Sequence, residues 1–427
     1  MKLAQIDKRK TALSLFAVLW LVMWSFLVLS LNIEWLRFST LAITICLVFF
    51  DIRQGRITLR PILQQRSTVL FIIFFTALCL FAIAWLLIDG HSLRTARNWI
   101  TFFIIGFGAV HYLGWKTFRF AIFGICAGLL VSVPLILLYM YWPEYSIMTP
   151  LSSPWDPRMA LYMEYCNDLG AMTAWGCCLW FFLRVNKQRI LSPGLDWLFL
   201  IIMAVPLFLS WYRTSIIAAA AIVIFMAITL PKLSIKKMLF AIVSTALVVI
   251  VLHQVPPPGH PQLRRVYSAI TSPHTDATIV SRLPLWEVAW HGYLQSPVYG
   301  NGLRSYSRLH KETLAKHGAE FRKKYPVVEV DMHRPHNLPL GIMSDMGTIG
   351  LILIIGVYAA GLAASGRVSP PFKIGLYALL YSLIIGITDT VMYETWLVLI
   401  VFSSCGGAFA GYLRRPEQEF TPGNRSE

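Results

Sequence analysis

Charged residues are scarce in this chain of 427 residues. Only 14% of its residues are Asp, Glu, Lys or Arg, whereas 57% are hydrophobic, and the mean hydropathy is +0.62. A soluble globular domain carries roughly 25% charged residues. The scarcity excludes an ordinary soluble domain and predicts an all-α polytopic membrane protein.

Paired cysteines and metal-binding motifs are also missing. The seven cysteines include no CxxC pair, so neither a zinc site nor a disulfide framework is indicated. The scattered histidines show neither an HExxH motif nor an i,i+4 pairing with a carboxylate. His333 and His336 are three residues apart, but Pro335 interrupts a helix between them. We expect no metal and no cofactor.

The formal net charge of +16 raises nucleic acid as a partner. However, Lys and Arg stand in short clusters between apolar runs, as membrane topology requires. The sequence has no basic, aromatic-interleaved soluble domain, so we expect no nucleic-acid binding.

Apolar runs of membrane-spanning length recur along the chain. A spanning helix needs about 20 mostly apolar residues. The first run is too long for a signal peptide and no small-residue cleavage site follows it, so we expect an uncleaved first helix. We predict about twelve transmembrane helices, at roughly 11–31, 34–51, 67–88, 97–114, 118–142, 166–184, 194–211, 214–230, 237–253, 338–364, 372–388 and 393–412.

The connectors between these runs alternate in charge. One set, which includes both termini, holds 21 Lys and Arg, whereas the short connectors of the other set hold five. The positive-inside rule places the first set, and so both termini, in the cytoplasm. A long loop, 254–335, then falls on the outer side, because long loops cross largely regardless of charge.

This loop concentrates groups that the bilayer core disfavours. It holds 11 of the 37 Lys and Arg and, with His253 and His336 at its borders, 8 of the 10 His. We expect the active site where the loop meets the membrane. The chain divides accordingly into transmembrane helices 1–9 (1–253), a loop domain (254–335), transmembrane helices 10–12 (336–412) and a cytoplasmic tail (413–427).

Arg213 is the first candidate site residue, between two apolar helices at the outer face. The following helix begins there, and an arginine beside a helix N-terminus is electrostatically awkward unless an anion lies between them. The two together form a phosphate site. The alternative is an arginine that extends along the helix to the membrane interface.

The second element is the segment 281–294, in which Leu283, Trp286, Trp290 and Tyr293 or Leu294 recur at helical spacing. Pro284 suits a first helical turn. This pattern predicts an amphipathic helix at the membrane surface with its aromatic face down and Arg282 at its N-terminal edge. The alternative is a helix that packs on the bundle, with Arg282 in water.

The third element is His333-Arg334-Pro335-His336-Asn337, which leads into helix ten. The helix dipole disfavours an imidazolium at an N-terminus, so His336 is expected to stay neutral there. A neutral imidazole accepts a proton from a hydroxyl or donates a hydrogen bond. The alternative is a capping role for Asn337 or His336.

These elements, in this order, resemble the O-antigen ligase and O-antigen polymerase superfamily of bacterial membrane proteins. The family pattern is an arginine at the outer end of a middle helix, then a large periplasmic loop with Arg-x-x-x-Trp and a Gly-x-Gly turn. A His-Asn pair then leads into a helix with Asp/Glu-x-Gly-x-x-Gly. The matching residues are Arg213, Arg282 with Trp286, Gly300-Asn301-Gly302, His336-Asn337, and Asp345, Gly347 and Gly350.

The resemblance covers roughly residues 195–400. It implies a GT-C-like fold with one large helical periplasmic loop, and a glycosyltransferase of lipopolysaccharide biosynthesis in the bacterial cell inner membrane. The donor would be a glycan on undecaprenyl diphosphate, and the acceptor would be lipid A-core oligosaccharide.

The resemblance also implies roles. Arg213 and Arg282 would hold the diphosphate, and His336 would orient or deprotonate the acceptor hydroxyl, in a metal-independent, inverting transfer. The substrate-binding residues would be Arg264, Arg265, Arg334, Asn337 and Trp286, the three arginines serving the phosphates of the core.

Length and a single dominant loop favour the ligase. The polymerase, or another oligosaccharyltransferase of the superfamily, stays an alternative because its donor chemistry is the same. A transporter for lipid-linked sugars is less favoured, since it predicts charges along a path through the helices, where only Asp345 and Asp389 lie in mid-helix.

Overall fold

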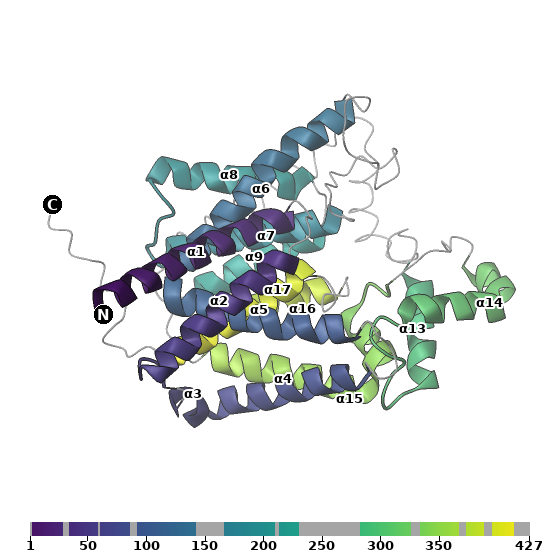
Figure 1. Cartoon of the computed structure of the whole chain (residues 1–427). Coiled ribbons are helices and arrows are strands. Elements are labelled where there is room, and N and C mark those ends of the chain that lie inside the picture. Colours follow the sequence, from purple (N-terminus) through teal and green to yellow (C-terminus); the bar gives the residue numbers. More distant parts are fainter. Residues whose placement is uncertain are drawn as a thin grey trace.

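The computed structural model describes residues 2–28, 34–58, 60–85, 92–141, 166–209, 213–229, 282–325, 334–366, 373–387 and 395–413. Within these ranges the chain forms helices and no strands (Figure 1). The first nine are α1 (Lys2–Val28), α2 (Glu34–Arg53), α3 (Arg60–Gln64), α4 (Arg66–Ala84), α5 (Ser92–Leu113), α6 (Lys116–Tyr141), α7 (Cys166–Val185), α8 (Pro193–Leu209) and α9 (Arg213–Thr229). The others are α13 (Leu283–Gln295), α14 (Tyr306–Lys324), α15 (Leu338–Gly366), α16 (Ile374–Gly386), α17 (Thr395–Ala410) and the 3-10 turn η5 (Gly411–Leu413).

Eleven of the twelve predicted apolar segments coincide with described helices, and the segment 237–253 lies outside the described residues. Among the described helices, four are long and apolar enough to cross a membrane, or five if the bent pair α5 and α6 is one span. The axes of that pair differ by 116°. The all-helical, polytopic character is therefore confirmed, whereas the count of twelve crossings stays a prediction.

Glycines allow the closest helix packing, between α5 and α17. A Cβ atom on Gly106 would lie 2.1 Å from the carbonyl oxygen of Ser403, and one on Gly406 would lie 2.0 Å from that of Phe103. Small residues let helix backbones approach closely where lipid gives no hydrophobic drive for association. Gly106 and Gly406 therefore let the backbones of α5 and α17 pack closely together.

The helices meet in one large aromatic core. Tyr381 donates its hydroxyl to the carbonyl of Ala171 at 2.6 Å, and Tyr358 bonds Ser382 at 2.9 Å. The fully buried rings include Trp99, Trp175 and Phe402. Buried aromatic rings with satisfied hydroxyls link α7, α15 and α16 into one body.

Ion pairs join connectors that the charge pattern assigns to the same side of the membrane. Arg9 and Arg56 both bond Asp51 near the end of α2, at 3.0 and 3.2 Å. At the opposite end of α2, Glu34 bonds Arg97 at 3.0 Å. Residues assigned to the same side of the membrane are thus paired, and which side is cytoplasmic stays a prediction.

The described part of the long loop forms a small unit of two helices. α13 and α14 pack through a cluster of their own, Leu285, Val288, Ala289, Tyr306, Leu309 and Phe321. α13 also packs against α15. Figure 1 shows α13 and α14 at the end of the bundle opposite the start of α1. The predicted helix at 281–294 is confirmed, whereas α14 was not predicted.

Candidate functional site

The central feature of the site is a break in α15. Gly347 has φ 63° and ψ −163°, so the helix is interrupted there. In an unbroken helix Thr348 and Ile349 would donate to the carbonyls of Ser344 and Asp345. Those two donors and two acceptors need other partners, because buried backbone groups left unpaired are costly.

The turn after α13 supplies these partners. The N–H groups of Thr348 and Ile349 donate to the carbonyls of Pro297 and Val298, at 2.8 and 3.2 Å. The carbonyls of Ser344 and Asp345 accept from the N–H groups of Asn301 and Gly302, at 3.0 and 2.9 Å. The turn therefore replaces both halves of the two lost helical bonds. We call residues 296–302 with 344–349 the joint.

The two backbones of the joint approach each other so closely that Gly300 and Gly347 have no room for a side chain. A Cβ atom on Gly300, where φ is 80°, would lie 2.3 Å from the carbonyl oxygen of Asp345. One on Gly347 would lie 2.4 Å from the carbonyl oxygen of Val298. The Gly-x-Gly and Asp-x-Gly patterns, read separately in the sequence, are therefore two sides of one contact.

Two polar side chains complete the joint. The Asn301 amide donates to the carbonyls of Gly292 and Ser344, at 2.6 and 2.9 Å. Asp345, only 2% exposed, accepts the N–H of Arg304 and the hydroxyl of Ser305, both at 2.9 Å. The mid-helix charge of Asp345 thus fixes the loop on α15, as hydrogen bonds to a buried carboxylate do.

The start of α15 carries the His-Asn pair. The Asn337 side-chain oxygen accepts the N–H of Leu340 at 3.0 Å, which is an N-cap. Its amide nitrogen lies 3.4 Å from the carbonyl of Ile387, directly after α16. The capping alternative is thus confirmed for Asn337, while its role in substrate binding stays a prediction.

His336 precedes this cap in a left-handed backbone conformation, with φ 48°. Non-glycine residues hold such conformations at a cost of about 1–3 kcal/mol, often at functional sites. The side chain is half-buried. Arg334, also half-buried, lies two residues earlier.

Arg282 stands at the start of α13, where its carbonyl accepts the N–H of Trp286 at 2.9 Å. Its side chain is half-buried. Trp286 packs against the α13–α14 cluster, and its buried indole N–H has no hydrogen-bond partner among the described residues.

The predicted aromatic face of α13 is wrong in part. Trp290 is 44% exposed, and Leu283 and Leu294 are exposed with it. Trp286, however, packs inside the loop, and the Tyr293 hydroxyl bonds Thr348 at 3.1 Å. Only half of the predicted stripe is exposed, because the joint and α14 cover the other half.

Helix packing brings the predicted site segments to one end of the bundle. α9 and α16 pack together, and Thr229 at the end of α9 bonds Tyr377 near the start of α16 at 2.9 Å. The helices are therefore antiparallel, so α9 begins at the end where α16 finishes. Arg213 begins α9, as predicted. Its end of the bundle is the one where Asn337 contacts Ile387.

Two predicted residues, Arg264 and Arg265, lie outside the described residues, as does Asp389. In the described ranges, no group of three or more His, Cys, Asp or Glu side chains is placed to hold a metal ion.

The described residues thus form several apolar helices of membrane-spanning length, and one of these helices is broken with the α13–α14 unit hydrogen-bonded into its break. These are features of a polytopic membrane protein. Residues 198–355 match the family model described as O-antigen ligase, which supports membership of the O-antigen ligase and polymerase superfamily. The matched region runs from α8 to α15 and includes Arg213, Arg282, His336 and the whole joint. The resemblance seen in the sequence is confirmed. No curated protein matches the chain.

Proposed function

We propose that the protein is an O-antigen ligase: a glycosyltransferase that moves the glycan of undecaprenyl diphosphate to lipid A-core oligosaccharide. The joint carries this proposal. It hydrogen-bonds the turn after α13 to α15. Arg282 stands at the start of α13, and His336 stands just before the start of α15, so the joint links the two helices that carry these residues. The family match over both segments supports it.

The proposed reaction is a direct displacement. An acceptor hydroxyl oxygen attacks the anomeric carbon of the donor, and the bond from that carbon to the diphosphate oxygen breaks. The electron pair leaves with the diphosphate, and Arg213 and Arg282 neutralise it. The guanidinium serves well because its charge is permanent and its fork is bidentate. Attack from the opposite face inverts the anomeric configuration.

His336 takes the hydroxyl proton or orients that hydroxyl for attack. It stands directly before Asn337, at the N-terminal end of α15. Arg334, Arg264 and Arg265 then bind the phosphates of the acceptor core. Trp286, with its unpaired indole N–H, belongs to the donor side near Arg282.

The proposed location is the periplasmic face of the inner membrane, with about twelve crossings and both termini in the cytoplasm. The exposed side chains Leu283, Trp290, Val298 and Tyr299 support it. An aromatic and aliphatic surface of this kind lies stably at the boundary between headgroups and acyl chains. The lipid tail of the donor then reaches the site from the side, between helices.

Purified protein tests the proposal, given lipid-linked O-antigen and lipid A-core with EDTA and without nucleotide. We expect lipid A-core to move to glycan-bearing bands on a gel. Longer lipid-linked glycans instead would identify a polymerase. The absence of both products would refute the proposed glycan transfer.

Substitution of the site residues tests their roles. Replacing Arg213 or Arg282 by Ala removes transition-state charge stabilisation and is expected to lower the transfer rate by roughly 10²–10³-fold. His336→Ala is expected to lower it by roughly 10²-fold or more at neutral pH. Lys323→Ala, exposed on α14, serves as the control. Full activity in Arg213→Ala would remove the phosphate role of Arg213.

A further inference from the structure

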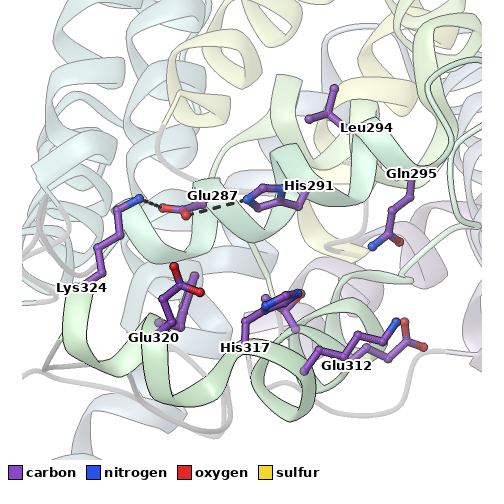
Figure 2. A pocket seen from close by; sticks show the side chains of 11 residues that line it. Glu287, His291, Leu294, Gln295, Glu312, His317, Glu320 and Lys324 are labelled. Atoms are coloured by element: carbon purple, nitrogen blue, oxygen red, sulfur yellow. Dashed lines mark hydrogen bonds and ion pairs between the residues drawn. The ribbon is translucent and has the colours of Figure 1, made fainter.

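A groove of about 490 Å³ lies between α13 and α14 (Figure 2). This volume falls within the roughly 300–1,000 Å³ of small-molecule sites. The α13 wall presents Glu287, His291 and Gln295, spaced four residues apart on one helix face. The α14 wall presents Glu312, Lys316 and Glu320 at the same spacing. The mechanism proposed above uses none of these side chains.

α14 is kinked at a residue that lines the groove. His317 has non-helical angles of φ −127° and ψ 16°, so α14 is kinked there. Beyond the kink Phe321 is buried against α13 as the floor of the groove. The start of α14 also contacts α13, where Tyr306 and Leu309 pack in the same cluster and the Tyr306 hydroxyl donates to the carbonyl of Leu285, so α14 is joined to α13 on both sides of the kink.

Ion pairs close one end of the groove. Glu287 accepts from the Lys324 ammonium at 2.8 Å and from the Tyr325 hydroxyl, and it lies 3.8 Å from His291, as Figure 2 shows for the two ion pairs. Burial opposes ionisation of Glu287, but the hydrogen bonds from Lys324 and Tyr325 outweigh it and lower the pKa of Glu287. This end is therefore a fixed, charged wall.

The middle of the groove holds polar groups available to a ligand. Glu312, Lys316 and Glu320 are exposed and form no hydrogen bond or ion pair with any other residue that the structure describes. Carboxylates accept hydrogen bonds from hydroxyls, and an ammonium donates to hydroxyl or ring oxygens. Leu294 and Phe321 add apolar contact beside them.

The charge of the groove selects against phosphate. Three Glu and two Lys line it, which gives a formal charge of −1 with neutral His. Phosphate recognition calls for a cationic excess, as an arginine cluster gives. The lining instead fits an uncharged, hydroxyl-rich chain, with acceptors and donors alternating along both walls.

The position on α13 relates the groove to the reaction centre. Arg282 begins α13, and the lining residues Glu287 to Gln295 lie about 8 to 20 Å farther along that helix by its rise of about 1.5 Å per residue. A donor whose diphosphate is held at Arg282 can thus extend its glycan along α13 into the groove.

We propose that this groove binds the uncharged polysaccharide chain of the donor, several sugars away from the bond that breaks. The proposal rests on the proposed function, since it takes the donor from there. The groove holds the chain while the acceptor approaches, so it acts on donor affinity and on the preference for long chains, not on the chemical step.

The test uses polysaccharide released by mild acid from the lipid-linked donor, free of lipid and phosphate, and the full-length protein in nanodiscs. The double variant Glu312→Gln/Glu320→Gln loses two charge-assisted hydrogen bonds to the polysaccharide. We expect its Kd for the released polysaccharide to be about tenfold higher than that of wild type. In transfer assays the KM for long-chain donor rises about tenfold at unchanged kcat. A donor with a single sugar does not reach the groove and keeps its KM.

Lys323→Gln is the matched control, since Lys323 is exposed on α14 and does not line the groove. It is expected to bind and transfer like wild type. Deacylated, phosphorylated core oligosaccharide is expected not to compete with the polysaccharide. Wild-type binding and KM in the double variant, or competition by the core oligosaccharide, overturns the proposal.

The two proposals fail in different ways. If wild type transfers glycan and the double variant behaves identically, the groove proposal falls and the ligase proposal stands. If wild type binds the polysaccharide through the groove but forms neither ligated nor elongated product, the transferase assignment falls and the groove stands as a polysaccharide site.

Discussion

The joint and the groove both border α13, yet the joint is formed mainly by backbone groups and the groove by side chains. The joint relies on backbone groups: four main-chain hydrogen bonds, glycines at positive φ and a carboxylate that is 2% exposed. The groove relies on exposed side chains spaced along two helices. A contact made by backbone depends on a few positions without substitutes, whereas a side-chain surface changes its ligand with little effect on the fold.

The largest effect is expected from Gly347→Ala in the joint. The substituted residue would hold φ 63° and ψ −163° with its Cβ atom 2.4 Å from the Val298 carbonyl oxygen. Backbone strain and overpacking together cost about 3 kcal/mol or more. We expect a lowered thermal unfolding midpoint in detergent and loss of transfer. Gly366→Ala, with open space around it, is the control, and equal behaviour of the two variants would contradict the role of the break.

Asp345→Ala should weaken the joint next most strongly. It leaves the N–H of Arg304 and the hydroxyl of Ser305 without their buried acceptor, at a cost of about 1–3 kcal/mol. The Arg304 amide should then exchange its hydrogen roughly 10- to 100-fold faster. Asp345→Asn keeps one acceptor oxygen and should show a smaller increase. Unchanged exchange in both would show that Asp345 does not hold the loop.

A third face of α13 sharpens the comparison, because it faces neither the joint nor the groove. Trp290 is 44% exposed there. In vesicles whose lipids are brominated near the headgroup, we expect Trp290→Phe to remove a measurable share of the quenched fluorescence. Trp286→Phe, at a ring packed inside the loop, should remove little of it. The reverse result would place the other face of α13 on the bilayer.

The smallest effect is expected from Glu287→Gln at the end of the groove. Because hydrogen bonds lower the pKa of Glu287, its stabilising contribution is present above the ordinary glutamate pKa and is lost as pH falls through the lowered value. The raised pKa of Lys324 keeps its contribution until pH rises above the ordinary lysine range. Lys324 is exposed, so solvent screens the pair and its contribution to stability is small.

Hydrogen exchange of α13 and α14 between pH 7 and pH 3 measures this contribution. Wild type should lose protection on acidification, and Glu287→Gln should start lower and lose less. A variant that loses as much protection as wild type would place the acid sensitivity elsewhere.

The sequence predicted well those features that depend on local patterns. Apolar runs located the helices, the start of α9 at Arg213 was found, and Pro284 with its apolar spacing located α13. Capping by Asn337 was among the alternatives because Asn at such a position accepts a nearby N–H. All of these depend on residues within one or two helical turns.

The joint could not be predicted, because its partners lie 43 to 51 residues apart in the chain. Gly300-Asn301-Gly302 predicts a turn and Gly347 a weak point in a helix, but every residue carries the backbone groups that join them. The groove was missed for a different reason. The spacing of Glu312, Lys316 and Glu320 is a pattern typical of an exposed helix, and it would have predicted α14.

The break at Gly347 also bears on how far the site stands from the hydrocarbon layer of the membrane. Residues 348–366, the part of α15 beyond the break, rise about 28 Å, close to the roughly 30 Å thickness of the hydrocarbon layer. If residues 348–366 cross the bilayer as proposed, Gly347 lies at the level where acyl chains give way to headgroups. The preceding residues 338–346 reach at most about 14 Å farther into water. That distance limits how far from the acyl chains His336 stands, and so how far a sugar hydroxyl must descend to meet the donor.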